Sequence, residues 1–273
     1  MILRPRQWQR ISLASTEAGS APKGSVSSRP IPESPRGFPV SAPLLRVLDA
    51  AFIPDSTGAL YWPAEETLIV ADLHLEKGSS LAGRGIFLPP YDSRVTLMRL
   101  GHVCATYRPK RVIALGDSFH DPEGPGRLPE ADAALLRVLT EAHDFVWIAG
   151  NHDGLSGCRL GGVAVEEPPL GPLLFRHAPH PRVVEGEVAG HLHPAARVKT
   201  RLGSVRRSCF AADGMRCILP AFGAFTGGLD LTDPAYEGLF GGGLTAFLLG
   251  KRAVHAFPFP PSRYRQASRF ITA

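Results

Sequence analysis

The chain has 273 residues and 29.3 kDa, so it can form one large domain or two small ones. Hydrophobic residues make up 44% of it and charged residues 20%, which is ordinary globular composition, and its longest uncharged stretches, about 13 residues, are too short to span a bilayer. The formal net charge of +5 and the pI near 9.2 invite a nucleic-acid interpretation, but net charge bears on association and not on fold.

The first 43 residues differ in composition from the rest. They contain seven prolines and eight serines, carry six basic and two acidic residues, and show little apolar periodicity. Such a segment cannot bury enough surface to offset its ordering entropy, so we predict a disordered tail over residues 1–43. No secretory signal follows the N-terminus and the four cysteines form no CxxC pair, so we expect reduced thiols and a cytoplasmic location.

From Leu44 onward, apolar runs alternate with helical spacing. In chain order we expect a strand at Arg46–Ile53, a strand at Thr67–Ala71, a helix at Tyr91–Tyr107, a strand at Arg111–Leu115, a helix at Pro129–His143 and a strand at Phe145–Ala149. Asp92 or Ser93 is placed to cap the first of these helices. The first half of the chain therefore has the strand–helix alternation of an α/β protein.

The second half is richer in strands. The candidates are Leu173–Arg176, Val183–Ala189, a hairpin of Val198–Arg201 and Val205–Phe210, then Cys217–Leu219, Leu244–Leu249 and Ala253–Phe257. The two halves together predict a mixed α/β sandwich in a single domain over residues 44–257. Residues 258–273 are predicted to form a basic tail, because residues 251–273 hold five basic residues and no acid, whereas residues 44–250 hold 19 basic and 23 acidic residues.

Carboxylates and imidazoles stand directly after several of these strands. The groups are Asp72 and His74, Gly116-Asp117, Gly150-Asn151-His152-Asp153, His177, and Gly190-His191-Leu192-His193. In α/β sheets the crevice beyond the carboxyl ends of the strands is where ligands bind, so we expect these side chains to converge. A glycine before Asp117, Asn151 and His191 lets the backbone turn sharply and approach closely.

Seven of these side chains are candidate metal ligands: Asp72, His74, Asp117, Asn151, His177, His191 and His193. One ion would not use so many ligands, whereas two ions that share a carboxylate would. Mixed nitrogen and oxygen ligands suit Mn, Fe or Zn better than Mg or Ca. Two such ions lower the pKa of bound water and hold both sides of a phosphoryl group, so no protein nucleophile is needed. His152, beside Asn151, is placed to act as the general acid for the leaving oxygen.

This ordered set resembles the calcineurin-like metallophosphoesterase superfamily, whose five blocks are all intact here. The resemblance implies an α/β/β/α sandwich of two mixed sheets in one domain. It also implies one metal site of Asp72, His74, Asp117 and His193, and a second of Asp117, Asn151, His177 and His191 that Asp117 bridges. His152 would be the acid or a transition-state stabiliser, so the expected catalytic residues are His152, Asp117 and Asn151.

Longer motifs are similar to one family in particular. Asp72-Leu-His-Leu-Glu-Lys-Gly-Ser-Ser-Leu, Leu88-Pro-Pro-Tyr-Asp, Gly116-Asp-Ser-Phe-His-Asp and Leu219-Pro-Ala-Phe-Gly-Ala-Phe-Thr-Gly-Gly-Leu resemble the bacterial ligase-associated DNA-damage-response endonucleases called PdeM. The similarity runs roughly from Leu44 to Phe257. It implies a manganese-dependent DNA phosphoesterase that works with an ATP-dependent DNA ligase, a DEAD/DEAH-type helicase and a metallo-β-lactamase-fold exonuclease.

Other residues have two interpretations. His120 either reaches substrate or orients Asp117, Asp153 is expected to hold the His152 loop, and Lys77 either contacts phosphate or is simply solvated. The segment 221–229 either lines the site or is a tight loop. Five bases flank the predicted hairpin and could position a DNA backbone or merely form its solvent face: Arg197, Lys199, Arg201, Arg206 and Arg207.

Two further functions remain open at this point. The same metal core would serve a phosphatase or nucleotide phosphodiesterase that acts on small molecules, because the core binds phosphate and the surrounding loops select the substrate. A metal-binding scaffold that docks a helicase or ligase without hydrolysis would be expected to lose ligands or the catalytic histidine. His152 and all seven ligands are present, which favours an enzyme.

Overall fold

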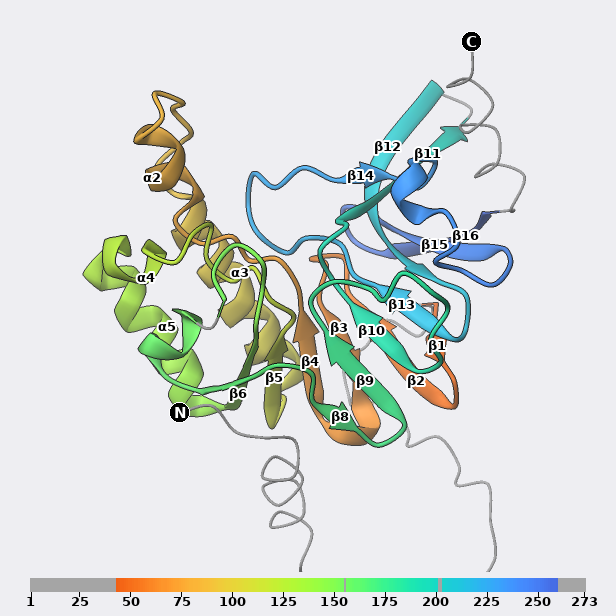
Figure 1. The fold of residues 1–273 in the computed structure, drawn as a ribbon, viewed down its shortest axis with the longest axis horizontal. Helices are drawn as coiled ribbons and strands as arrows, with labels where there is room; N and C mark the ends of the chain where they lie inside the picture. Colours follow the sequence, from red (N-terminus) through yellow and green to blue (C-terminus); the bar gives the residue numbers. More distant parts are fainter. Residues whose placement is uncertain (1–42, 155, 201–202, 260–273) are drawn as a thin grey trace, which may run out of the picture.

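The computed structural model describes residues 43–154, 156–200 and 203–259 (Figure 1). The tails predicted at 1–43 and 258–273 lie almost wholly outside the described residues. What remains is two sheets stacked face to face, with helices over the outer face of the first (Figure 1). This arrangement confirms the predicted α/β/β/α sandwich of two mixed sheets.

The first sheet has seven strands in sequential order. They are β1 (Leu45–Val47), β2 (Ala50–Pro54), β3 (Leu60–Trp62), β4 (Thr67–Val70), β5 (Arg111–Ala114), β6 (Asp144–Ile148) and β7 (Val163–Val165). The strands β1 to β4 form an antiparallel meander and β4 to β7 run parallel. The single strand predicted at Arg46–Ile53 is wrong, because Leu48 has a left-handed φ of 52° and splits it into a hairpin.

The helical layer consists of the connections between the parallel strands. Its elements are α2 (Lys77–Ala82), α3 (Asp92–Tyr107), α4 (Gly124–Arg127) and α5 (Glu130–Ala142), with the short 3-10 turn η2 (Ser156–Leu160). A further 3-10 turn, η1 (Pro63–Glu65), joins the antiparallel strands β3 and β4. Apolar residues of α3 and α5, such as Leu97, Leu100 and Leu136, pack on the face formed by Leu68, Val112 and their neighbours. Within the described part of the chain, no helix combines the length and the apolarity needed to cross a membrane.

The start of α3 differs from the expectation. Neither Asp92 nor Ser93 caps its own helix. Instead the Asp92 carboxylate accepts a hydrogen bond from the backbone nitrogen of Gly78 at 3.0 Å, and the Ser93 hydroxyl pairs with both the backbone nitrogen and the carboxylate of Glu76 at 2.8 Å. These buried contacts fasten the short helix α2 to α3, which explains the polar residues Glu76, Asp92 and Ser93 in this part of the sequence.

The second sheet comprises nine strands of mixed direction. They are β8 (Pro169–Leu170), β9 (Leu173–Arg176), β10 (Glu187–Ala189), β11 (Pro194–Thr200), β12 (Gly203–Ala212), β13 (Arg216–Ile218), β14 (Leu229–Asp230), β15 (Leu244–Leu249) and β16 (Val254–Phe259). The strand predicted at Val183–Ala189 begins only at Glu187. The outer face of the second sheet is covered by the segment 231–244, which includes the 3-10 turn η3 (Pro234–Tyr236), so the fourth layer of the sandwich is thin.

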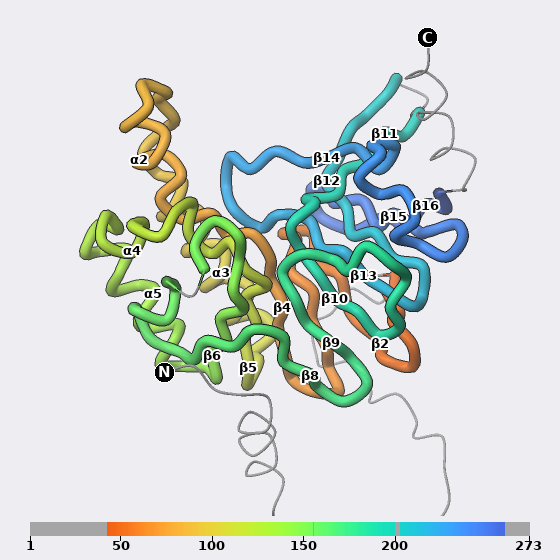
Figure 2. Tube along the Cα trace, in the orientation of Figure 1, coloured from red at the N-terminus to blue at the C-terminus, as the bar shows by residue number. Residues whose placement is uncertain are grey.

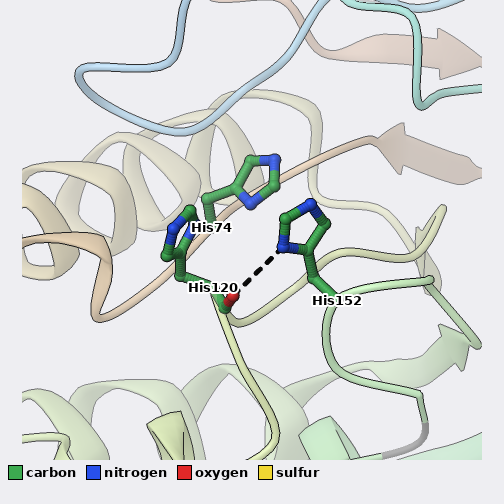
Figure 3. Close-up of side chains that lie close together, drawn as sticks. All are labelled: His74, His120 and His152. Carbon is green, nitrogen blue, oxygen red and sulfur yellow. Dashed lines mark hydrogen bonds between the residues drawn. The ribbon is translucent and has the colours of Figure 1, made fainter. Parts of the chain in front are cut away.

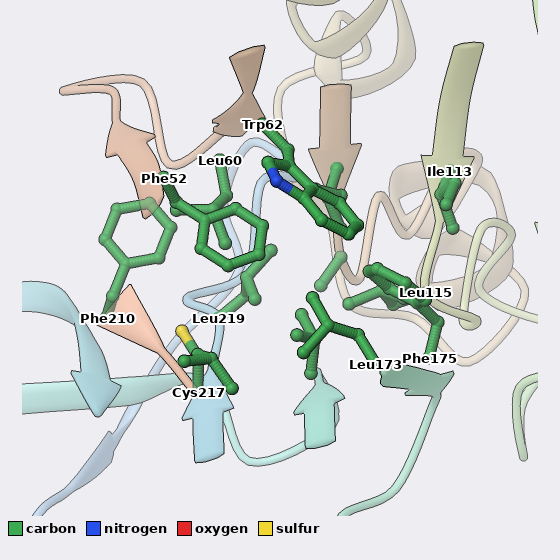
Figure 4. Packing of buried hydrophobic residues seen from close by; sticks show 14 of the residues in the cluster. Phe52, Leu60, Trp62, Ile113, Leu115, Leu173, Phe175, Phe210, Cys217 and Leu219 are labelled. Atoms are coloured by element: carbon green, nitrogen blue, oxygen red, sulfur yellow. The ribbon is translucent and has the colours of Figure 1, made fainter. Parts of the chain in front are cut away.

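The core between the two sheets is continuous and apolar. Trp62 lies between Phe52 of the first sheet and Phe175 of the second, with ring centroids 5.3 and 6.4 Å apart (Figure 4). Leu115 and Leu219 extend the same cluster toward the strand ends that carry the polar residues. Burial of this cluster fixes the two sheets against each other and therefore fixes the relative positions of those ends.

The second sheet also contains a buried ion pair. The Arg216 side chain of β13 is fully buried, and its Nε lies 2.5 Å from Oε2 of Glu187 on β10. The same guanidinium donates to the carbonyl oxygens of Leu239, His180 and Arg182 at 2.6, 2.9 and 2.6 Å. The network holds three loop carbonyls against the start of β10, the strand that leads to His191 and His193.

We predict that Arg216→Met will lower the free energy of unfolding by about 3–5 kcal/mol, because it removes the buried partner of Glu187 Oε2 and leaves only Oε1 paired, with Arg176 and the His180 nitrogen. Urea unfolding followed by circular dichroism measures this. The control is Arg137→Met, which breaks the exposed pair with Glu130 and should leave the transition almost unchanged. Equal effects of the two substitutions would contradict the prediction.

Candidate metal centre

The polar residues that follow the strands meet at one place. Asp72 and His74 follow β4, Asp117 follows β5, and Asn151 and His152 follow β6, all in the first sheet. From the second sheet, His177 follows β9, and His191 and His193 follow β10. All seven candidate ligands therefore come from the carboxyl ends of parallel strands, where ligands of α/β proteins bind.

The first cluster contains Asp72, His74 and His193, whose ligand atoms all lie within 4.8 Å of one another. Asp72 is fully buried, and its Oδ1 lies 3.2 Å from Nε2 of His193. His74 Nδ1 and His193 Nε2 are buried atoms without a hydrogen-bond partner. Buried polar atoms normally have partners, so these two nitrogens are consistent with ligands of an ion.

The second cluster contains Asp117, His177 and His191, again with ligand atoms within 4.8 Å. His177 Nε2 lies 3.3 Å from Oδ2 of Asp117, 2.7 Å from Oδ1 of Asn151 and 3.1 Å from Nδ1 of His191. On the other side of its ring, Nδ1 pairs with the carbonyl oxygen of Leu115 at 2.9 Å. A ring that donates through Nδ1 presents the lone pair of Nε2 to the cluster, as metal-binding histidines do.

The electrostatics favour the metal-binding protonation state for His74 and Asp117. Burial and the neighbouring His193 lower the pKa of His74 to about 3, so its imidazole is neutral at pH 7. Burial would raise the pKa of Asp117, but hydrogen bonding and the charge of His177 outweigh burial and hold the pKa at about 2. Burial would lower the pKa of His177, but its hydrogen bond to Asp117 and the charges of Asp72 and Asp117 outweigh burial and raise it. Neutral imidazoles and ionised carboxylates are the metal-binding forms, so His74 and Asp117 fit a divalent cation, and binding at His177 would release the proton of its imidazole.

Unusual backbone conformations aim these ligands. Asp72, His74, Asp117, His191 and His193 have φ values of 55°, 43°, 45°, 69° and 47°, in the left-handed region that side-chain-bearing residues rarely adopt. Each costs of the order of 1–3 kcal/mol and persists only where the surrounding structure imposes it. Here the left-handed turns end the strands abruptly and bring successive side chains toward one point.

A third group of histidines borders the first cluster. His74, His120 and His152 have ligand atoms within 4.8 Å, and Figure 3 shows their three rings facing a common space. His152 is 41% exposed, its Nδ1 pairs with the carbonyl oxygen of His120 at 3.2 Å, and its Nε2 lies 3.8 Å from Oδ2 of Asp117. The His120 ring stacks on that of His152 with centroids 5.3 Å apart. Burial, with the charges of His152 and Lys77, lowers the pKa of His120.

Two of the secondary candidates are placed by their hydrogen bonds. The buried Asp153 carboxylate accepts from the backbone nitrogen of Phe119 at 2.9 Å, so it ties the loop of His152 to the loop of Asp117. Burial raises the pKa of Asp153 to about 6. Lys77 stands at the start of α2, and its ammonium donates to the carbonyl oxygen of Phe225 at 3.2 Å.

The basic hairpin is formed by β11 and β12, with Arg197 opposite Arg206 and Ala196 opposite Arg207. Because side chains alternate across a strand, Arg197, Lys199 and Arg206 share one face and Arg207 lies on the other. Arg206 donates to the carbonyl oxygen of Gly228 and lies 3.9 Å from Asp230. Arg201 lies outside the described residues.

Sequence reasoning left the segment 221–229 undecided and gave Leu115 no role. The backbone nitrogens of Phe222 and Gly223 donate to the carbonyl oxygens of Ala71 and Asp72 at 2.8 and 3.1 Å, so this segment borders the site. The Leu115 carbonyl orients His177 through a main-chain atom. No side-chain pattern could reveal that contact, whereas the glycine-rich composition of 221–229 indicates either a segment that lines the site or a tight loop.

A sandwich of this kind, with two histidine–aspartate clusters at the ends of its parallel strands, defines a metallophosphoesterase-type hydrolase that acts on ester bonds. The chain is 29% identical to the Pseudomonas putida nuclease MPE, with a TM-score of 0.63 over 79% of this chain and all of that one. The phosphoesterase Yfce from E. coli matches at 15% identity and a TM-score of 0.37, over 70% and 97% of the two chains. No protein-family model and no curated protein matches the chain.

We predict that Gly150→Ala will weaken Mn²⁺ binding by about 10–100-fold, because its methyl group would collide with the backbone nitrogen and carboxylate of Asp117. Isothermal titration calorimetry measures the affinity. Gly126→Ala is the matched control, since a methyl group there meets open space. Unchanged metal affinity of folded Gly150→Ala would show that this close approach does not shape the centre.

Proposed function

We propose that the chain is a dimetal phosphodiesterase that cleaves DNA. The observation that carries the proposal is the pair of adjoining clusters, Asp72–His74–His193 and Asp117–His177–His191, each built for a divalent cation. The similarity to nuclease MPE supports a nucleic-acid phosphodiester as the substrate. The catalytic domain in this proposal covers residues 44–257.

The proposed ligands divide into two sets. Asp72, His74, Asp117 and His193 would hold one ion, and Asp117, Asn151, His177 and His191 the other, with Asp117 shared. The mixture of imidazole nitrogens and carboxylate oxygens favours Mn²⁺, with Fe or Zn as alternatives. Bound ions would supply a water of lowered pKa and neutralise charge on the phosphoryl group.

His152 is the residue proposed to assist the leaving oxygen. Its backbone nitrogen donates to Oδ1 of Asp117 at 2.9 Å, and its Nδ1 pairs with the carbonyl oxygen of His120, so its Nε2 points toward the carboxylate cluster. The exposed edge of the ring can reach a substrate from solvent. Nε2 of this ring would donate a proton to the leaving oxygen as the phosphodiester bond breaks.

DNA would contact the hairpin as well as the metals. Arg197 and Lys199 are exposed on the face that also holds Arg206, next to the segment that borders the site. Arg197 lies directly opposite Arg206, and the repulsion between these two positive charges is unfavourable in the free protein. A phosphate between them would turn the arrangement into a favourable one. Figure 2 shows this hairpin and α2 projecting on the same side of the molecule.

The biological setting rests on the longer motifs. Their resemblance to the PdeM endonucleases supports DNA cleavage in ligase-associated repair in the cytoplasm, in association with an ATP-dependent DNA ligase, a DEAD/DEAH-type helicase and a metallo-β-lactamase-fold exonuclease. The intact set around Asp72, Asp117 and His152 argues against a scaffold that has lost activity.

We predict that His152→Ala will lower kcat for Mn²⁺-dependent DNA cleavage roughly 100- to 10,000-fold, because it removes the proposed proton donor but none of the proposed ligands. Calorimetry should still find two ions bound per chain. Asp117→Ala should instead lose both activity and the second ion. Undiminished cleavage by purified His152→Ala would refute its role, and hydrolysis of small phosphoesters without any DNA cleavage would favour the small-molecule enzyme.

We further predict that replacing Arg197 and Lys199 together with Ala will reduce the slope of log affinity against log salt by about 1.5, or roughly 0.7–0.9 for each phosphate that the protein no longer neutralises. Fluorescence anisotropy of a labelled DNA across a salt series measures this slope. Arg207→Ala, on the opposite face, is the control and should keep the wild-type slope. An equal slope in all three proteins would contradict DNA binding by this face.

A further inference from the structure

The segment from Phe222 to Gly228 is anchored at both ends beside the Asp72–His74–His193 cluster. At its start, a methyl group on Gly223 would collide with the carbonyl oxygen of Leu73. At its end, a methyl group on Gly228 would come within 2.6 Å of the carbonyl oxygen of His193, to which Leu229 also donates its backbone nitrogen. The segment therefore spans the distance between two ligand-bearing turns of one cluster.

Contacts from three other elements hold the segment in place. From α3, the Thr96 hydroxyl accepts the backbone nitrogen of Ala224 at 2.9 Å, and Arg99 donates to the carbonyl oxygen of Phe222 at 2.9 Å. From α2, Lys77 donates to the carbonyl oxygen of Phe225, and from β12, Arg206 donates to that of Gly228. Figure 1 shows the segment, in blue, between these helices and the hairpin.

Phe225 in the middle of this segment is strained and exposed. Its φ is 57°, a left-handed conformation that is a genuine outlier for a bulky side chain, and 50% of its surface is exposed. Exposure of one apolar side chain is common and by itself carries no argument. The sequence, however, has glycines at 223, 227 and 228 and still places a phenylalanine at the left-handed position, so the strain is not relieved where it could be.

We propose that Phe225 is a substrate-positioning residue whose ring stacks on a nucleobase adjoining the phosphate held at the metal centre. An aromatic ring gains affinity from any base, because every base has a π-face. The surrounding cations, Lys77 and Arg206, bind the backbone carbonyls of the same segment and add positive charge near the sugar–phosphate chain. This inference rests on the proposed function and adds to it a preference for DNA in which that base is free to stack.

The test compares two strands of equal length and charge with Mn²⁺-loaded enzyme. One is a thymidine oligonucleotide and the other carries abasic tetrahydrofuran units at its centre. Phe225→Ala should lower the ratio of kcat/KM for the thymidine strand to that for the abasic strand roughly 10- to 100-fold, mainly through KM. Phe225→Trp should retain the ratio, and the control Phe257→Ala, which truncates an exposed phenylalanine on β16, should not alter it.

One further variant and one further substrate separate the possible failures. Phe225→Gly removes the ring and the strain together, so it should gain thermal stability while it loses the base dependence. If Phe225→Ala leaves the ratio of the two kcat/KM values unchanged, whether or not both values fall, the proposed role of Phe225 is overturned. Failure of the proposed function would look different: the wild type would hydrolyse bis-p-nitrophenyl phosphate but cut neither strand. Fluorescence anisotropy would then test base stacking by Phe225 through binding alone. Equal affinity of the wild type for the thymidine and abasic strands would overturn the proposed stacking.

Discussion

The Asp117 carboxylate, which follows β5, is buried among groups that come from two other strand ends. It accepts the backbone nitrogen of His152, lies 3.3 Å from His177 Nε2, and packs so closely on Gly150 that no side chain fits there. A buried carboxylate that keeps its charge requires such partners, because desolvation alone would neutralise it. The loops after β5, β6 and β9 are therefore positioned around one charge, and the ligands that they carry follow from it.

Much of the site could be predicted from the sequence, since strand ends in a parallel sheet converge whatever the details of packing. Asp72, Asp117 and His191 were identifiable because each follows a short apolar run. The left-handed φ of the same residues was not, because side-chain patterns predict strand and helix but not the turn that ends them. The break at Leu48 and the use of Asp92 between two helices escaped prediction for a related reason: both depend on a distant main-chain partner, Gly214 in one case and Gly78 in the other.

The charge distribution also takes on a different meaning once the fold is known. The formal charge of +5 is a sum over the chain, whereas the described body brings Asp72, Asp117 and the neutral His74 together at one end of the sandwich. Without cations, the carboxylates at that end would repel a phosphate. Arg197 and Lys199 stand apart from it on the hairpin, so attraction of a polyanion and accommodation of its scissile phosphate belong to different parts of the molecule.

Each ligand cluster combines side chains from both sheets: Asp72 and His74 with His193, and Asp117 with His177 and His191. Neither sheet alone holds either of these two clusters, so the binding energy of a cation at them is available only when the sandwich is closed. A metal present at a hundred times its Kd would favour the closed form by about 2.7 kcal/mol. Metal occupancy would thus report on the docking of the two sheets, and a chain in which they had separated would release its ions before the strands of either sheet came apart.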